Sequence, residues 1–253
     1  MTELKAIQIS DSVYWVGAID WNVRNFHGYN TSRGTTYNAF LILDEKITLV
    51  DTVKGGFFEE MMLRISSLVD PSKIEYFISN HSEPDHTATL PDVIREIKPE
   101  KIFASKMGVK ALNAHYDIDM EMTAVDDGGR ISIGQKHLSF IETRMLHWPD
   151  SMFSYLEEER VLFSQDAFGM HLASSERFGG ELNWDLLKRQ AESYYANIIT
   201  LYSPHIQKLL KKIEESGLKI DVVAPDHGPV WRGDEKFTRL LKLYQKWSSR
   251  SLD

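Results

Sequence analysis

The stretch IEYFISNHSEPDH, residues 74–86, joins an apolar run to a dense group of polar side chains. The apolar part, residues 74–79, is typical of a buried β-strand. Two histidines and two acidic residues then follow within residues 81–86, namely His81, Glu83, Asp85 and His86. Imidazole nitrogens and carboxylate oxygens are metal ligands, so this segment predicts a metal site just beyond the end of a strand.

The spacing inside this segment allows it to serve more than one metal ion. Side chains alternate along an extended chain, so His81, Glu83 and Asp85 can share one side while His86 points elsewhere, and Pro84 stiffens the turn. One loop could therefore supply ligands to two adjacent metals. The alternative, a strand end at which these side chains pack together without a metal, is disfavoured.

Three more ligand-type residues come directly after apolar runs: His147, Asp166 and His227. The carboxyl ends of strands are where α/β proteins place their sites. Taken singly, each has another interpretation: His147 beside Trp148 could be a packed aromatic edge, Asp166 a helix cap, and His227 a turn residue before Gly228. Together with residues 81–86 they form a candidate ligand set.

The order of the predicted elements favours an α/β fold. Strand-like runs are expected at residues 12–19, 36–43 and 46–51, and again at 74–79, 101–105, 122–125, 137–143, 152–156, 160–164 and 219–224. Helical patterns are expected at residues 57–69, 90–97, 108–115, 184–201, 205–216 and 235–250. This order predicts two mixed β-sheets with helices on their outer faces. No repeat or linker marks a boundary, so one domain over residues 1–253 is expected.

Composition excludes several classes of protein. The 253 residues contain no cysteine, which removes disulfides, thiolate metal sites and cysteine nucleophiles. The formal net charge of −8 argues against a broad nucleic-acid-binding surface. The N-terminal residues lack the pattern of a secretory signal, and no apolar stretch is long enough to span a membrane. We therefore expect a soluble, cytoplasmic protein that binds neither nucleic acid nor a membrane.

The ligand-type residues, in their order along the chain, resemble those of the metallo-β-lactamase superfamily, whose members carry H-x-H-x-D-H, a later His, a later Asp and a final His. Glu83 stands where the second His is usual, and this departure resembles the H-x-E-x-D-H loop of flavodiiron proteins. Three flanking segments also resemble flavodiiron sequences: residues 21–40 (WNVRNFHGYNTSRGTTYNAF), 146–153 (LHWPDSMF) and 194–197 (YYAN). The resemblance implies an αβ/βα sandwich with its site where the two sheets meet.

The resemblance also implies how the ligands are shared between two iron ions. One iron would take His81, Glu83 and His147, the other Asp85, His86 and His227, and Asp166 would bridge them together with an oxo, hydroxo or peroxo group. The donor chemistry favours iron over zinc without excluding zinc, because carboxylates and imidazoles suit iron and no thiolate is present.

Residues around the metals are also implied by the resemblance. His27 and Tyr195 resemble residues that line the flavodiiron pocket, where an imidazole or a phenol could donate a hydrogen bond to a bound ligand. Trp148 would form a wall, and Asp226 could hydrogen-bond a ligand instead of binding metal. No motif surrounds the other histidines, so the surface is expected for His115, His137, His171 and His205.

The functional expectation depends on what supplies electrons. Flavodiiron proteins continue into a flavodoxin-like domain that binds FMN, whereas this sequence ends at Asp253, so we expect one diiron domain without an FMN site. The leading interpretation is an oxygen sensor or carrier that binds O₂ as a peroxo-diferric adduct. The alternative is an O₂ or NO reductase supplied by a separate rubredoxin or flavoprotein, whereas a sensor would act through a signalling partner. A zinc-dependent hydrolase is a third interpretation, and the resemblance implies a homodimer.

Overall fold

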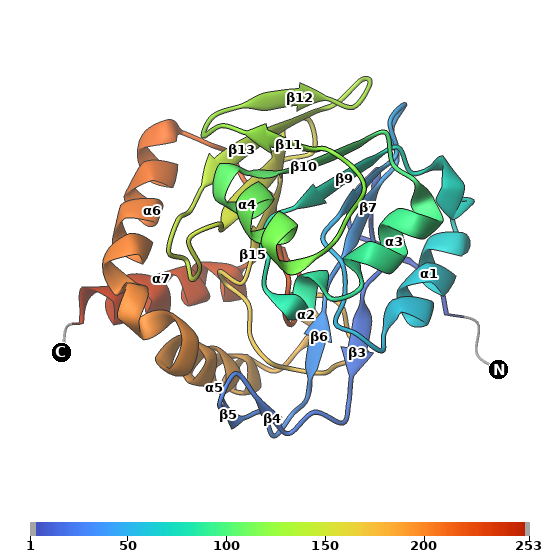
Figure 1. Cartoon of the computed structure of the whole chain (residues 1–253). Helices are drawn as coiled ribbons and strands as arrows, with labels where there is room; N and C mark the ends of the chain where they lie inside the picture. Colours follow the sequence, from blue (N-terminus) through green and yellow to red (C-terminus); the bar gives the residue numbers. More distant parts are fainter. Residues whose placement is uncertain (1–3, 251–253) are drawn as a thin grey trace.

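The computed structural model describes residues 4–250 and stacks two mixed β-sheets between two layers of helices (Figure 1). The first sheet has seven strands in the order β1 (Ile7–Gln8), β2 (Val13–Trp15), β7 (Phe40–Ile42), β8 (Thr48–Val50), β9 (Tyr76–Ser79), β10 (Lys101–Ser105) and β11 (Met122–Val125). Pairing is antiparallel from β1 to β8 and parallel from β8 to β11.

The second sheet has six strands in sequence order, β12 (Arg130–Ser132), β13 (His137–Glu142), β14 (Met152–Leu156), β15 (Val161–Gln165), β16 (Val222–Pro225) and β17 (Trp231–Arg232). Only β15 and β16 pair in parallel in this sheet. Two short antiparallel ribbons, β3 (Ala18–Asp20) with β6 (Thr35–Tyr37) and β4 (Asn25–Phe26) with β5 (Tyr29–Asn30), lie at one end of the molecule.

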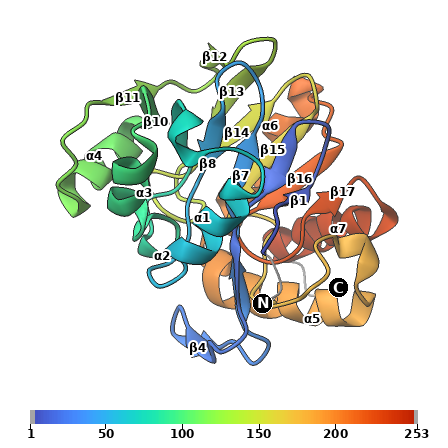
Figure 2. The ribbon, with the colours of Figure 1, turned by 90° about the vertical axis from the view of Figure 1, so that its right-hand side faces the viewer.

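Helices cover the outer face of each sheet, as the side view in Figure 2 also shows. The helices on the side of the first sheet are α1 (Phe58–Ser66), α2 (Pro84–Thr87), α3 (Leu90–Ile97) and α4 (Lys106–His115). The second sheet is covered by α5 (Trp184–Tyr194), α6 (Ser203–Ser216) and α7 (Glu235–Ser249). Shorter helical turns are Pro71–Lys73, Gly179–Glu181, Tyr195–Ile199 and Thr200–Tyr202. Within residues 4–250, no helix combines the length and the apolar character that a membrane crossing requires.

The strand residues explain this layering, because apolar side chains point to both faces of each sheet. In β7, Phe40 and Ile42 pack in the core between the sheets, while Leu41 packs in the core under α1 and α3. In β15, Phe163 faces the inter-sheet core, while Leu162 packs on the side of α5, α6 and α7. Both sheets are thus buried on two faces, which is why their strands read as continuous apolar runs.

The predicted architecture of two mixed sheets flanked by helices is confirmed, and several boundaries differ. The runs 12–19 and 36–43 each split between the large sheet and the β3–β6 ribbon. At Gly17, between the two parts of the first run, a Cβ atom would lie 2.2 Å from the carbonyl oxygen of Tyr37, so glycine permits the close approach. The helix expected at 184–201 ends at Tyr194 and continues as a wider π-helical turn over Tyr195–Ile199. Strands β1, β4, β5, β12 and β17 were not expected.

Candidate metal centre

All seven predicted metal ligands meet at one end of the interface between the sheets. His81 and Glu83 lie between β9 and α2, and Asp85 and His86 lie in α2 itself. His147 comes from the loop between β13 and β14. Asp166 and His227 each follow the end of a strand, β15 and β16 respectively. The parallel pairing of β15 with β16 brings these last two residues to the same sheet edge.

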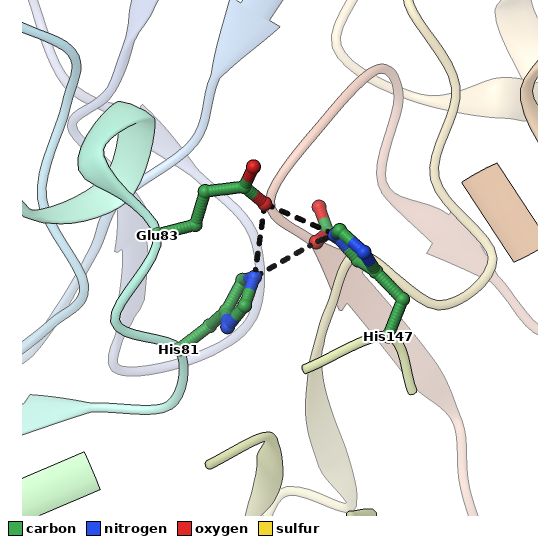
Figure 3. A group of neighbouring side chains, drawn as sticks. His81, Glu83 and His147 are labelled. Atoms are coloured by element: carbon green, nitrogen blue, oxygen red, sulfur yellow. Dashed lines mark hydrogen bonds and ion pairs between the residues drawn. The ribbon is translucent and has the colours of Figure 1, made fainter. Parts of the chain in front are cut away.

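The first group of ligand atoms belongs to His81, Glu83, His147 and Asp166. Oε2 of Glu83 lies 3.2 Å from Nε2 of His81 and 3.0 Å from Nε2 of His147. Figure 3 shows these three side chains pointing toward one another. Oδ2 of Asp166 completes the group, at 3.3 Å from Nε2 of His81 and 3.1 Å from Nε2 of His147.

The second group consists of Asp85, His86 and His227, and it faces the other oxygen of Asp166. Oδ2 of Asp85 lies 3.3 Å from Nε2 of His86 and 3.1 Å from Nε2 of His227. Oδ1 of Asp166 lies 3.5 Å from each of the same two nitrogens. The two carboxylate oxygens of Asp166 therefore face two separate ligand groups.

These side chains fit a pair of metal ions. Ligand atoms around a metal with bonds of about 2.1 Å lie about 3.0–3.5 Å apart, which matches the spacings in both groups. Several of the buried atoms make no hydrogen bond within the described structure: both oxygens of Asp85, both oxygens of Asp166, Nε2 of His86 and Nε2 of His227. Unpaired buried polar atoms are costly, and a metal ion would satisfy them.

The outer nitrogen of three of these histidines faces an oxygen, which holds Nε2 toward the centre. Nδ1 of His81 lies 3.4 Å from Oδ2 of Asp150, and Nδ1 of His86 lies 3.6 Å from Oδ2 of Asp226. Nδ1 of His227 donates a hydrogen bond of 2.6 Å to the carbonyl oxygen of Thr36. Asp226 thus faces the candidate ligand His86, and not His227, which follows Asp226 in the sequence.

Asp51, which the sequence analysis missed, anchors the base of the ligand segment. It follows β8 and is fully buried, and its carboxylate accepts hydrogen bonds from the backbone nitrogen of Asn80 at 2.7 Å and from Nδ2 of Asn80 at 2.9 Å. Burial raises the pKa of the Asp51 carboxyl to about 6. Its place directly after an apolar strand, like that of Asp166, is the signal that could have found it.

Without a metal, the ligands neutralise one another as ion pairs. Burial opposes the charged form of Glu83, but His147 and His81 outweigh it and hold the pKa of this carboxyl at about 2. Burial likewise opposes protonation of His147, but Asp166 and Glu83 raise the pKa of this imidazole to about 9. Burial also opposes protonation of His86, but the carboxylates of Asp85, Asp226 and Asp166 together raise its pKa to about 10. A bound metal would take the place of these protons.

His27 lies where the resemblance implied, beside the metal ligands. It occupies the turn between β4 and β5, and its Nε2 lies 3.4 Å from Oε1 of Glu83 and 3.7 Å from Oδ2 of Asp85. A cavity of about 430 Å³ opens next to it, and its walls are Phe26, His27, Lys54, Gly55, Glu83, Pro84, Asp85 and Ala88. A larger hollow of about 1060 Å³ between α6 and α7 contains none of the candidate ligands.

The surface location expected for His171 is wrong. This side chain is 2% exposed, with its Nε2 3.2 Å from Nδ1 of His27 and its Nδ1 2.8 Å from Oγ1 of Thr35. The irregular segment after Asp166 folds back over the centre, and no periodic pattern in the sequence marks that path. His171 therefore joins Thr35 and His27 in a hydrogen-bonded row that leads to Glu83 and Asp85.

Tyr195, which was expected to line the pocket, lies apart from the candidate ligands. Its neighbour Tyr194 occupies the position that was expected for Tyr195. The hydroxyl of Tyr195 is 3.0 Å from Oγ of Ser203, and its ring packs against Tyr244. The ring centroid of Tyr194 lies 5.0 Å from that of His171. Burial, together with the charge of Asp166, raises the pKa of Tyr194 well above its usual value. Successive residues of a helix point about 100° apart, so only one of these two tyrosines can face the centre.

The ring of Trp148 stands edge-on to His81, with centroids 5.3 Å apart, and forms the expected wall. Of the other histidines expected at the surface, His115 is exposed, and His137 and His205 are partly exposed.

Comparison with known proteins places this centre in a family. The family profile described as "ODP family beta lactamase" matches residues 35–228. A nitric oxide reductase of Moorella thermoacetica is 43% identical over 245 residues, which cover 96% of this chain and 61% of that protein. The rubredoxin-oxygen oxidoreductase of Megalodesulfovibrio gigas is 43% identical over 249 residues, covering 98% of this chain and 62% of that protein.

Solved structures give the same result. The rubredoxin oxygen:oxidoreductase from Desulfovibrio gigas superposes with a TM-score of 0.95 at 42% identity, over 98% of this chain and 62% of that chain. The flavodiiron protein from Giardia intestinalis superposes with a TM-score of 0.94 at 35% identity, over 99% of this chain and 61% of that chain. The chain thus spans about three fifths of the length of these relatives. It belongs to the ODP family of β-lactamase-like domains, the family that forms the metal-binding core of flavodiiron proteins.

Proposed function

We propose that this chain is a diiron reductase that reduces O₂ or NO with electrons from a separate donor. The observation that carries the proposal is Asp166, whose two oxygens face two ligand groups, one of which contains Glu83 in place of a histidine. Relatives named nitric oxide reductase, rubredoxin-oxygen oxidoreductase and coenzyme F420H(2) oxidase support reduction. They favour this reading over the sensor or carrier that the sequence analysis put first.

The ligand groups indicate where each iron would be held. His81, Glu83 and His147 would hold one ion, and Asp85, His86 and His227 would hold the other, with Asp166 between them. A bound iron pair would supply electrons and open coordination positions for a diatomic molecule. Three carboxylates offset part of the positive charge of such a pair. Imidazole and carboxylate ligands suit iron, and the site contains none of the soft thiolates that select zinc. The same charge balance disfavours a zinc hydrolase.

The surrounding residues supply hydrogen-bonding groups. Nε2 of His27 faces Glu83 and Asp85 at the wall of the 430 Å³ cavity, where it can donate a hydrogen bond or a proton to a molecule bound there. The contact of Nδ1 of His27 with His171 fixes the orientation of the ring. Tyr194 places a second hydroxyl near the centre, and that hydroxyl has no hydrogen-bonding partner within the described structure.

Reduction needs an outside donor, because reducing O₂ to water takes more electrons than two iron ions store between their ferrous and ferric states. The test is to load the protein with iron anaerobically, measure the metal content, and then follow O₂ and NO consumption with reduced rubredoxin present. We expect two irons per chain and sustained consumption of at least one of the two gases.

Two outcomes would contradict the proposal. A reduced protein that forms a long-lived visible absorption band with O₂, and that does not consume O₂ or NO catalytically with any reduced donor, would restore the sensor interpretation. A protein that keeps zinc in preference to iron and hydrolyses esters would restore the hydrolase. The matched control is Asp119→Asn, an exposed carboxylate outside both ligand groups, which should leave iron content and turnover unchanged.

A further inference from the structure

A third group of ligand atoms lies beside the two that share Asp166. It consists of one atom each from His27, Glu83 and Asp85, all within 4.8 Å of one another. Nε2 of His27 lies 3.4 Å from Oε1 of Glu83 and 3.7 Å from Oδ2 of Asp85. A cation with bonds of about 2.1 Å can span both spacings, because two of its ligand atoms can lie up to about 4.2 Å apart. We call this the outer group, and the two groups that share Asp166 the inner groups.

The carboxylates of the outer group also belong to the inner groups. Oε2 of Glu83 faces the two histidines of the first inner group, and Figure 3 shows the other oxygen of Glu83 pointing away from them. That other oxygen, Oε1, faces His27. Oδ2 of Asp85 faces His27 and also lies 3.1 Å from Nε2 of His227, in the second inner group. The outer group therefore adjoins both inner groups, one through each carboxylate.

The outer group is also the part of the centre that lines the cavity of about 430 Å³. Exposed residues form part of the same wall, so the cavity opens to solvent; they are Gly55, Pro84 and Ala88. Three histidines of the inner groups are fully buried, namely His81, His86 and His227. A cation that enters the cavity from water therefore meets the outer group before it meets these imidazoles.

The charges of the cavity wall favour a cation. The wall carries the carboxylates of Glu83 and Asp85 against one ammonium, that of Lys54, which lies 4.5 Å from the ring centroid of Phe26. The side chain of Asp85 is 4% exposed, and neither of its oxygens makes a hydrogen bond within the described structure. A buried carboxylate without partners is costly, and a cation in the cavity would satisfy it.

The hydrogen-bonded row behind His27 can leave a lone pair for this cation. Nδ1 of His27 lies 3.2 Å from Nε2 of His171, and Nδ1 of His171 lies 2.8 Å from Oγ1 of Thr35. The hydroxyl of Thr35 donates to the carbonyl oxygen of Thr36 at 3.2 Å, so it can accept from Nδ1 of His171. Nε2 of His171 then accepts from Nδ1 of His27, and Nε2 of His27 presents its lone pair to two carboxylates. A cation between these three atoms stabilises that arrangement.

We infer that the outer group is the entry site through which divalent metal ions reach the two inner groups. At entry, three bonds from the ion to water break, and three bonds to Nε2 of His27, Oε1 of Glu83 and Oδ2 of Asp85 form, with no change of oxidation state. The two carboxylates then keep their hold while buried imidazoles take the place of His27. Nε2 of His27 is again free to face a molecule in the cavity, as the proposed function requires. The inference rests on the metal centre of the proposed function and not on reduction of O₂ or NO.

The rate of metal uptake, measured without O₂, NO or any electron donor, tests the entry site. The probe is Co²⁺, whose visible absorption reports its ligands, mixed rapidly with the metal-free protein. In the wild type the observed rate should approach a maximum as the Co²⁺ concentration rises, because fast binding at the outer group precedes slower transfer inward. His27→Asn should load at least about tenfold more slowly and without a maximum over the same range. It should still reach two ions per chain and the wild-type final spectrum.

Asparagine suits this position because His27 has φ +51°, a conformation that asparagine tolerates better than most residues. The matched control is His115→Asn at an exposed position in α4, which should load as the wild type does. Lys54→Met is a second test with the opposite sign. It removes the ammonium from the cavity wall and should speed uptake at low ionic strength, with less effect in high salt. Its control is Lys110→Met, also exposed in α4.

Wild-type loading by His27→Asn would overturn the inference and indicate another route, such as the partly exposed edge of His147. So would a His27→Asn protein that holds fewer than two ions or differs in its final spectrum, because His27 would then be a ligand of the loaded centre. If circular dichroism shows that His27→Asn does not fold, Lys54→Met decides, and unchanged or slower uptake by Lys54→Met would contradict the entry site.

Failure of the proposed function gives a different pattern. An iron-loaded protein that consumes neither O₂ nor NO with a reduced donor would refute the reductase, while the uptake kinetics of Co²⁺ would still report on the outer group. A protein that takes up no Co²⁺ would refute the inner groups, and the entry site with them.

Discussion

Asp166 is the residue on which both ligand groups depend. It is fully buried, its Oδ2 faces His81 and His147, and its Oδ1 faces His86 and His227. A buried carboxylate at the meeting point of several imidazoles provides charge as well as two separate donor atoms. Replacing one oxygen by an amide nitrogen keeps the shape of the side chain but removes the charge and one of the two donor atoms.

Asp166→Asn should therefore lose both metal ions, with an affinity at least about 100-fold lower for each, because the amide offers one oxygen and no charge. Metal analysis after dialysis against a weak chelator measures the loss. The comparison variant is Asp150→Asn, which alters the contacts of this side chain with Nδ1 of His81 and with the backbone nitrogen of Ser82, and it should weaken the first group alone. Two irons retained by Asp166→Asn would refute its assignment as the bridge.

His171 carries a second prediction at the same scale. Its ring lies 5.2 Å from His27, 5.0 Å from Tyr194 and 4.7 Å from His227, measured between ring centroids. His171→Ala should lower the free energy of unfolding by about 2–4 kcal/mol, because it leaves a cavity and removes a partner of a buried imidazole. It should also slow gas reduction while the metal content stays unchanged, since His171 belongs to neither ligand group.

Urea unfolding and metal analysis test this prediction for His171. The control is His115→Ala, at an exposed position near the end of α4, where we expect a change within about 0.5 kcal/mol. If His171→Ala and His115→Ala changed the free energy of unfolding equally little, the hydrogen-bonded row from Thr35 to His27 would not contribute to stability.

At the scale of elements, the ends of strands and the turns that follow them place the ligands. β15 and β16 pair in parallel, so the chain leaves both at the same edge, and Asp166 and His227 emerge side by side. The turn after β16 is tight: Gly228 has φ +77°, and a Cβ atom there would lie 2.7 Å from the carbonyl oxygen of Met170. The backbone next to the candidate ligand His227 therefore requires glycine for two independent reasons.

Gly228→Ala should be more destabilising than Gly217→Ala. Both glycines have positive φ, +77° and +64°, so both substitutions carry the cost of a left-handed conformation, about 1–2 kcal/mol. Only at Gly228 does the new methyl group also meet backbone, whereas nothing lies within 4 Å of it at Gly217. Thermal unfolding of the metal-free variants gives the difference, and equal melting temperatures would show that the turn can relax.

The strands could be predicted from the sequence where apolar runs were continuous. Their exact boundaries could not be predicted. The runs for β9, β10, β14 and β15 read as strands because both faces of each sheet are buried. The two-residue strands β4, β5 and β17 have no such run, and they form because the hairpin and the last turn fit against residues distant in sequence. The split at Gly17 depends on contact with Tyr37, which no local pattern contains.

At the scale of the whole molecule, it was predictable that the seven candidate ligands would come together, and their surroundings were predictable only in part. Each candidate ligand follows an apolar run or lies in the segment 81–86, and that is a local signal. The choice between Tyr194 and Tyr195 was not predictable, since it depends on how α5 is rotated against the second sheet and on the π-helical turn that follows. The burial of His171 depends on the path of a long irregular segment, which follows from packing alone.

The charge balance of the centre gives the last prediction, which concerns stability against pH. His147 and His86 have pKa values raised from 6.5 to about 9 and about 10 in the metal-free protein. A raised imidazole pKa stabilises the fold fully below about pH 6.5, and this contribution is lost as the pH rises through about 9–10. The melting temperature of the metal-free protein should therefore fall between pH 7 and pH 10.

The iron-loaded protein should behave differently, because the metal holds the same imidazoles neutral and removes their titration from this range. Its melting temperature should stay level over the interval in which that of the metal-free protein falls, so the gap between the two widens with pH. Below about pH 9 both imidazoles are protonated in the metal-free protein, and these protons compete with the metal, so the apparent affinity for iron should decrease as the pH is lowered. Scanning calorimetry of both forms at several pH values measures the gap. A metal-free protein with a constant melting temperature from pH 7 to pH 10 would show that its imidazoles do not stabilise the fold as cations.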